Sequence, residues 1–250
     1  MILTVDLYNL FIDSVRADKR GNTKEIDEFN RCLRLVNQEV FDDFLGDFEK
    51  DIDNSQDLGE LKVHNTAITL ALSGGMMVGT LPTNYSRLIG KPRDDSATAK
   101  RIELVTTLED AERQDDYLTQ ATATHPTCVI GGVTALSAMQ IRVRPQTIGT
   151  IYIDYIKKPT VPFLDYYIND STLTPTFLTV DTTPAVTAGN TYRDGTAGGV
   201  GVTVTSLTEN LDWDDGVIQL LLAKLLQKTG LTLADDKLLQ GGMAEELKTK

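Results

Sequence analysis

The segment from residue 212 to residue 230 constrains the fold of this chain most, because it is the most apolar run with helical spacing. Aspartates occupy its start, where the free N–H groups and the positive end of a helix dipole favour carboxylates, and Gly230 is a typical stop. One apolar stripe is formed by Val217, Leu220, Leu221 and Leu225, and a second by Ile218, Leu222 and Leu226. A surface helix needs one such stripe, so two stripes predict burial on both sides.

Two interpretations of the second stripe remain open. In the first, residues 212–230 form the central core helix of a mid-sized domain and pack on the N-terminal region. In the second, the additional apolar face packs on another subunit. The candidate subunit interface then consists of Ile218, Leu222 and Leu226.

Residues 1–60 are predicted to form a pair of antiparallel helices followed by an acidic loop. Thr4 is the expected N-cap of a helix that ends at Arg16, and Thr23 the expected N-cap of a longer helix to Phe44. The longer helix has apolar residues every three or four positions: Ile26, Phe29, Leu33, Val36, Val40, Phe41 and Phe44. The acidic loop fails the EF-hand pattern, because Gln56 stands where glycine is required and Lys62 where glutamate is required.

The remainder of the chain is predicted to be mainly β-structure. Residues 61–162 alternate apolar and polar side chains, and segments 138–144 and 150–156 are the best candidates for a β-hairpin. Residues 163–211 are rich in Thr, Gly and Asn, with strand-like pieces at 176–180 and 200–205, which predicts a protruding β-hairpin or small β-lobe. The predicted fold is therefore α+β, with a few helices packed on an antiparallel β-part.

Residues 231–250 form a C-terminal tail with too few apolar residues for a core of its own. Glycines 241 and 242 disfavour one continuous helix. Two interpretations remain open, namely a segment that becomes ordered on a partner and a frayed end without a partner.

The composition excludes several classes of function. The 24 Lys and Arg residues against 36 Asp and Glu residues give a net charge of −12, which disfavours tight binding to the phosphates of nucleic acids. Cys32 and Cys128 have no zinc-like spacing and indicate reduced thiols in a cytosolic setting. The N-terminus has no basic leader typical of a signal peptide, and no apolar run is long enough to span a bilayer.

Motifs for catalysis, metal binding and cofactor binding are absent from the sequence. The glycine-rich run near residue 200 has Val204 in place of the third glycine of a dinucleotide fingerprint, and no phosphate-binding loop or Gly-x-Ser-x-Gly motif occurs. His64 and His125 are best interpreted as structural or surface residues. We therefore expect a protein that is not an enzyme and that holds no metal and no cofactor.

Four segments in a fixed order resemble one known family. They are FNRCLRLVNQEVFDDF, GTLPTNYSRLIG, IRVRPQTIGTIYIDYIKKPTVP and LDWDDGVIQLLLAKLLQKTGL. From Thr4 to Leu233 the chain resembles the head-to-tail connector proteins, also called adaptor or neck ring proteins, of tailed bacteriophages. It is nearest to those of the short-tailed crAss-like phages. Residues 163–211 depart from the pattern, because they are more numerous than in the smallest members.

The resemblance implies a non-enzymatic part of the virion, made in the host cytoplasm. Such proteins form a homo-oligomeric ring, typically dodecameric, below the portal protein, and they provide a platform for the next tail protein. DNA passes through the channel of the ring without tight binding. C-terminal segments of the family commonly dock onto the portal or a neighbouring subunit, a role that the resemblance implies for Leu231, Leu233, Leu238, Leu239 and Leu247.

A different class of function remains as the alternative. In this alternative the chain is a cytosolic, non-enzymatic binding module that binds a protein or a glycan through residues 163–211. This alternative predicts a monomer or dimer, whereas the connector interpretation predicts rings.

Overall fold

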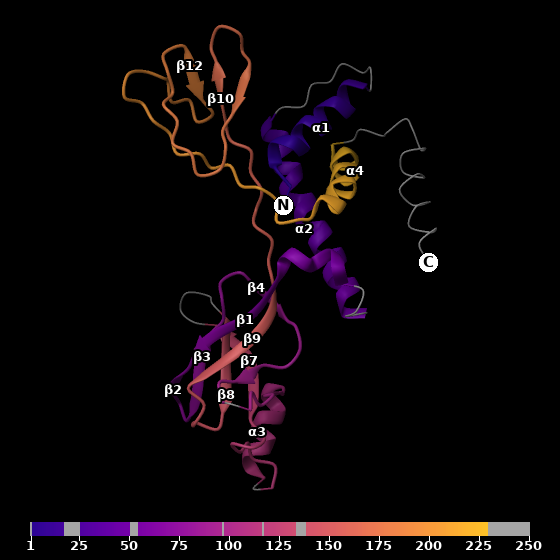
Figure 1. Cartoon of the computed structure of the whole chain (residues 1–250), viewed down its shortest axis with the longest axis vertical. Coiled ribbons are helices and arrows are strands. Elements are labelled where there is room, and N and C mark those ends of the chain that lie inside the picture. Colours follow the sequence, from indigo (N-terminus) through magenta and orange to yellow (C-terminus); the bar gives the residue numbers. More distant parts are fainter. Residues whose placement is uncertain are drawn as a thin grey trace. The chain divides into compact units, whose positions relative to one another are not determined.

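The computed structural model describes residues 2–17, 26–50, 55–96, 98–116, 118–133 and 139–229, and it confirms the predicted α+β class (Figure 1). The helices are α1 (Thr4–Ala17), α2 (Ile26–Lys50), α3 (Thr107–Asp115) and α4 (Ile218–Lys228), with 3-10 segments at Ser55–Leu61 and Asp215–Val217. The chain divides into two compact units. Unit 1 comprises Met1–Glu60 and Pro159–Lys250, and unit 2 comprises Leu61–Lys158.

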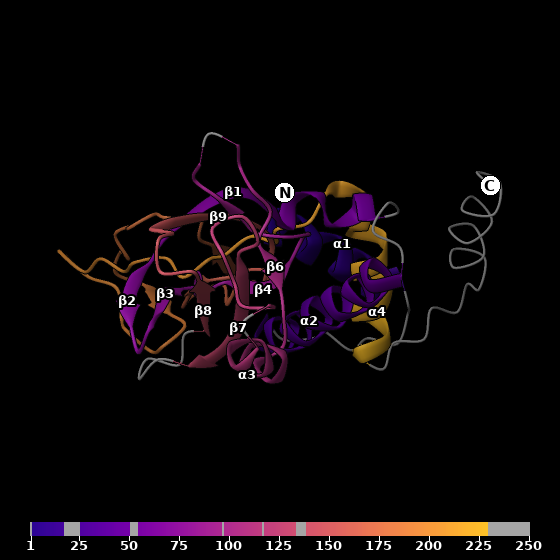
Figure 2. The ribbon, with the colours of Figure 1, turned by 90° about the horizontal axis from the view of Figure 1, so that it is seen from below.

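Helices α1, α2 and α4 form the helical part of unit 1, and α4 packs against both of the others (Figure 2). The predicted periodicity of the second helix is confirmed, since six of its seven predicted apolar positions are buried and Phe44 is half-buried: Ile26, Phe29, Leu33, Val36, Val40 and Phe41. Phe11 of α1 and Leu221 and Leu225 of α4 complete this core. Helix α2 supplies more buried side chains than either neighbour and continues to Lys50, beyond the expected end at Phe44.

The predicted capping role of Thr4 is wrong. Thr4 is the first residue of α1, and its hydroxyl donates a hydrogen bond to the Glu209 carbonyl (2.6 Å) while its N–H donates to the Asn210 side chain (3.2 Å). The Leu3 carbonyl accepts the first amides of the helix instead. The segment that precedes α4 runs back along the N-terminus, so Thr4 fastens these two distant segments together. Thr23 lies outside the described residues.

Residues 163–209, here called the β-lobe, fold within unit 1 as a small antiparallel sheet. Strand β10 (Tyr166–Asn169) lies between β11 (Pro175–Phe177) and β12 (Asn190–Tyr192). The strand expected at 200–205 is wrong, because this segment makes only the isolated bridge between Ala185 and Thr203. Backbone segments come very close here, since a Cβ atom at Gly198 would lie 2.0 Å from the Thr187 carbonyl oxygen.

Unit 2 contains two sheets that share one apolar core. One has the order β1-β9-β4, with β5 also paired to β9, and the other has the order β2-β3-β8-β7-β6. The strands are β1 (Lys62–Thr69), β2 (Ala71–Ser73), β3 (Met76–Thr80), β4 (Tyr85–Leu88), β5 (Arg93–Asp94), β6 (Glu103–Leu104), β7 (Thr127–Val133), β8 (Met139–Arg144) and β9 (Thr150–Lys157). Helix α3 packs against β7 and begins with a capping box between Thr106 and Glu109.

The predicted hairpin between segments 138–144 and 150–156 is wrong, although both segments are strands. Strand β8 pairs with β3 and β7, whereas β9 pairs with β1, β4 and β5 in the other sheet. Ile141 and Val143 of β8 and Ile151 and Ile153 of β9 are nevertheless all buried in the same core. Alternation identifies the buried face of a strand, but it does not identify the neighbouring strand.

Candidate functional site

Two buried asparagines on α2 fasten the extended chain that follows unit 2. Asn30 and Asn37 are seven residues apart and therefore lie on the same face of the helix. The Asn30 amide donates to the Leu164 carbonyl and accepts from the Leu164 N–H, both at 2.9 Å. The Asn37 amide donates to the Thr160 carbonyl (3.1 Å). The Asn30 side chain thus satisfies two backbone groups of Leu164 that would otherwise be buried without a partner, and Asn37 binds a part-buried carbonyl.

The same face of α2 also fixes the segment before α4. The indole Nε1 of Trp213 donates to Asn37 Oδ1 (2.6 Å), and the Trp213 side chain is almost completely buried. One residue earlier, the Asp212 carboxylate accepts hydrogen bonds from the N–H (2.7 Å) and the hydroxyl (2.6 Å) of Thr160. Contacts among Asn37, Thr160 and Asp212 therefore hold two segments of unit 1 beside α2, the one that contains Thr160 and the one that precedes α4.

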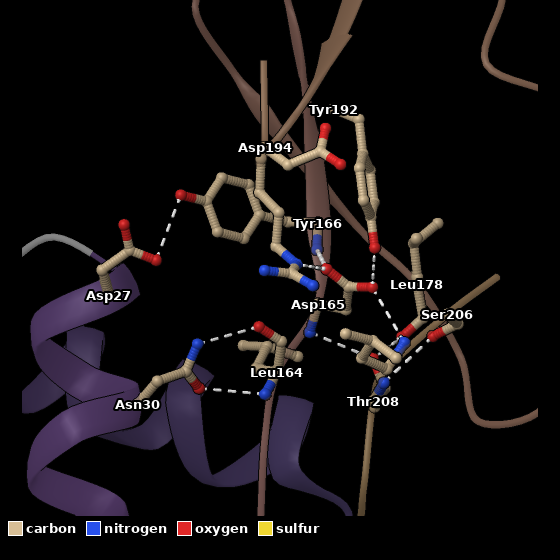
Figure 3. A network of polar contacts seen from close by, with 12 residues as sticks. Asp27, Asn30, Leu164, Asp165, Tyr166, Leu178, Tyr192, Asp194, Ser206 and Thr208 are labelled. Carbon is tan, nitrogen blue, oxygen red and sulfur yellow. Dashed lines mark hydrogen bonds and ion pairs between the residues drawn. The ribbon is translucent and has the colours of Figure 1, made fainter. Parts of the chain in front are cut away.

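A network of polar contacts surrounds Asp165, a carboxylate with no exposed surface (Figure 3). One oxygen accepts from the Tyr166 N–H (3.0 Å) and from Arg193 Nε (2.5 Å). The other accepts from the Leu207 N–H (2.9 Å) and from the Tyr192 hydroxyl. A buried charge is tolerated only when it is paired and hydrogen-bonded in this way.

Residues around Asp165 extend the network in two directions. The Arg193 guanidinium lies 5.1 Å from the centroid of the Phe163 ring, and its side chain is 25% exposed. Toward the helices, the Tyr166 hydroxyl donates to Asp27 of α2 (3.4 Å). Burial, and then the bond to Asp165, raise the pKa of Tyr192 above its ordinary value of 10, so its hydroxyl keeps its proton at neutral pH. The network therefore joins the β-lobe to itself and to α2.

The Asp165 carboxylate is suited to anchoring and not to proton transfer. A carboxylate has about four lone-pair positions, and four protein donors already occupy those of Asp165. A general base must instead present a free lone pair to its substrate. The Asp165 network is therefore a structural element of unit 1.

The two histidines, both predicted to be structural or surface residues, lie at the surface of unit 2. His64 is 65% exposed, with Nδ1 at 3.7 Å from the Asp154 carboxylate. Asp154 also accepts from the Asn65 N–H (2.7 Å) and from Arg93 (3.3 Å), and Asn65 has a positive φ of 55° within an irregularity of β1. Asp154 thus supports the backbone at this point. His125 is exposed and shares a hydrogen bond with a neighbouring threonine hydroxyl.

Within the described residues we find neither an activated Cys128 thiol nor a cluster of side chains that could bind a metal ion. Burial raises the pKa of Cys128 to about 12, so its thiol is protonated and unreactive at neutral pH. In the described ranges no group of three or more His, Cys, Asp or Glu side chains is placed to hold a metal ion. None of the helices in these ranges is long and apolar enough to cross a membrane.

The residues of the predicted subunit interface differ in how deeply they are buried. Leu226 is buried within unit 1, whereas Ile218 and Leu222 are half-buried. Leu220, a member of the first apolar stripe, was predicted to be buried but is 38% exposed. The predicted docking residues Leu231, Leu233, Leu238, Leu239 and Leu247 lie outside the described residues.

Sequence reasoning missed Asn30, Asn37 and Asp165. A signal for the asparagines existed, because both fall on the apolar face of the periodic segment 26–44, where a polar residue requires a buried partner. No comparable signal marked Asp165, because the hydrogen-bond donors to its carboxylate lie up to 42 residues away in the sequence. No protein-family model matches this chain, and no curated protein matches it.

The two units differ strongly in charge. Unit 1 contains 13 Lys and Arg residues against 27 Asp and Glu residues, a net charge of −14. Unit 2 contains 11 basic and 9 acidic residues, a net charge of +2. The acidic excess of the chain therefore resides entirely in unit 1, so that one protein presents two surfaces of opposite electrostatic character.

Proposed function

We propose that this chain is a structural, non-enzymatic virion protein, a ring-forming head-to-tail connector of a tailed bacteriophage. It binds below the portal protein, extends the DNA channel and provides a platform for the next tail protein. The order of segments in the sequence, from FNRCLRLVNQEVFDDF to LDWDDGVIQLLLAKLLQKTGL, supports this proposal.

The segregation of charge between the units is the observation that carries the proposal. The acidic unit 1 of one copy is complementary in charge to the weakly basic unit 2 of the next copy. Contacts between two different surfaces are heterologous, and they close into a ring when the rotation between copies allows it. Self-association of this kind is what a connector requires.

Two further features are consistent with a structural role. The buried polar groups of unit 1 bind one another and leave Asp165 without a free lone pair, as expected of a scaffold that holds its parts in place. The net charge of −12 repels phosphate, so that DNA passes without adhering.

The direct test is to mix the purified full chain with the portal protein of the same phage and to measure the mass of the particles by mass photometry. The proposal predicts one discrete complex of the portal with a ring of this chain, typically of twelve copies. A protein that stays monomeric or dimeric and does not bind the portal contradicts the proposal. Binding of a glycan or host protein through the β-lobe in that case supports the alternative of a binding module.

A further inference from the structure

The solvent-facing side of the β1-β9-β5 sheet carries a row of two arginines and one tyrosine. Tyr152 of β9 lies directly opposite Ala67 of β1 on one side and Arg93 of β5 on the other, and Arg93 lies opposite Arg101. Directly opposed residues project from the same face of a sheet. The alternate residues Ile151 and Ile153 of β9 are buried in the core of unit 2, so the row faces outward. We call Tyr152, Arg93 and Arg101 the basic row.

The cations of this row are only partly neutralised by their surroundings. Arg93 contacts the Asp154 carboxylate at 3.3 Å. Arg101 is exposed, and within the described part of the chain its side chain has no hydrogen bond or ion pair. The nearby Asp94 adds no exposed negative charge, because it is buried and accepts from Ser96 and the Lys100 N–H. The neighbouring Asp95 is exposed, so the surroundings of the row are basic only together with the other cations of the same sheet, Lys62, Arg87 and Lys157.

The charge of unit 2 is itself unevenly distributed. Six of its nine acidic residues lie in residues 103–116, which include α3. The rest of unit 2, residues 61–102 and 117–158, contains 10 Lys and Arg residues against 3 Asp and Glu residues, a net charge of +7. The basic row thus lies in the part of unit 2 that carries the excess of basic residues.

The composition of the row matches that of a protein-binding surface. Tyrosine and arginine are enriched among the residues that contribute most to protein–protein binding. The planar guanidinium of arginine also fits a carboxylate through two parallel hydrogen bonds. The matching partner is therefore a protein surface rich in carboxylates.

Unit 1 of a second copy is such a surface. In the described part of unit 1, 13 Asp and Glu side chains are exposed, against the exposed cations Arg31, Arg34 and Lys228. Each copy supplies this acidic surface at the same concentration as the basic row. Duplex DNA is a less suitable partner, because the chain as a whole has a net charge of −12.

We propose that the basic row of Tyr152, Arg93 and Arg101 binds the acidic unit 1 of a second copy of this chain. The contact joins two different surfaces, so each copy binds one neighbour through its basic row and another through its unit 1. Successive copies then form a closed ring or an open filament. That the product is a ring rests on the proposed function, whereas the contact itself is tested separately.

The test compares single and double variants of the full-length chain by sedimentation velocity over a range of protein concentrations and salt concentrations. The test variants are Arg101→Glu and the charge-removing double variant Arg93→Gln with Arg101→Gln. The matched controls are Arg142→Glu and Arg142→Gln, at a half-buried arginine on the other sheet. Circular dichroism and a thermal melt of each variant verify that it is folded.

The wild-type chain is expected to self-associate at low ionic strength and to dissociate as salt is added. Loss of interfacial charge pairs should weaken this association about tenfold or more in both test variants, while the controls stay within about twofold of the wild type. The inference is overturned if the test variants self-associate as strongly as the wild type. If the same preparations still form rings on the portal protein, the proposed function is unaffected. Conversely, Arg101-dependent association without any portal binding retains the contact and refutes the connector role.

Three other outcomes also overturn the inference. The first is a wild-type chain that remains monomeric at low salt. The second is a variant that changes the sedimentation coefficient of the monomer without any dependence on concentration, which would show that the row binds unit 1 of its own chain. The third is a duplex DNA affinity that Arg101→Glu abolishes while self-association is unchanged, which would identify nucleic acid as the partner.

Discussion

Replacing the buried Asp165 by asparagine should destabilise unit 1 by about 3 kcal/mol. The substitution keeps the shape of the side chain but removes the charge that pairs with Arg193, and its NH2 group must face donors such as the N–H of Leu207 or Tyr166. Breaking a fully buried ion pair costs about 3–5 kcal/mol, and a buried donor left unsatisfied costs about 1–3 kcal/mol. Because the Arg193 side chain is 25% exposed and can turn to water, we expect the lower end of the first range.

The assay is urea unfolding followed by the fluorescence of Trp213, the single tryptophan of the chain, which is buried in unit 1. With a slope of about 1–3 kcal/mol per molar urea, a loss of about 3 kcal/mol lowers the midpoint by roughly 1–3 M. Asp170→Asn is the matched control, because it makes the same change at an exposed position of the β-lobe. A midpoint for Asp165→Asn that equals that of the control would refute the assignment of the Asp165 network as an anchor of unit 1.

Four further predictions follow from other sites. Asn37→Leu should destabilise unit 1 by about 1–3 kcal/mol, because it leaves the buried Trp213 N–H unpaired and removes the bond to the Thr160 carbonyl, whereas the exposed Gln38→Leu should not; urea midpoints compare the two. Hydrogen bonds from Lys228 and Lys224 hold the pKa of Glu39 below its ordinary value of 4.5. These bonds therefore contribute fully to stability above pH 4.5, and the contribution is lost as the pH falls through the lower pKa of the folded state. Glu39→Gln should remove this part of the dependence of stability on pH. The Cys128 thiol should react with an aromatic disulfide reagent at pH 8 only after unfolding, and rapid reaction of the native protein would contradict its burial. Duplex DNA should bind weakly at every salt concentration when binding is measured by fluorescence anisotropy. A dissociation constant in the micromolar range or below at physiological salt, with a steep dependence on salt, would contradict the prediction that DNA passes without binding tightly.

Periodicity in the sequence predicted the elements of this fold better than their partners. The spacing of Phe29, Leu33, Val36 and Val40 identified α2 and its buried face, because a helix satisfies its backbone locally and needs only one apolar side. The alternation in β8 and β9 likewise identified their inward residues, but the predicted pairing of these strands was wrong. Strand pairing is a long-range property, since β9 pairs with β1, about 90 residues earlier in the sequence.

The polar contacts of unit 1 could be predicted only in part. Asn30 and Asn37 break an apolar stripe, which indicates buried polar partners without identifying them. Thr4 was expected to satisfy its own helix, yet it bonds to Glu209, because tertiary contacts bring a distant segment beside it. Asp165 resembles any other aspartate in this acidic sequence, and only the fold reveals that four donors converge on it.

The proposed connector role is tested most directly by localising this chain in virions purified from cultures that express it. Electron microscopy with an antibody label on the chain should show it in every virion, at the single vertex where the head meets the tail. Absence of the chain from the virions, or a label distributed over the whole capsid, would contradict the connector role.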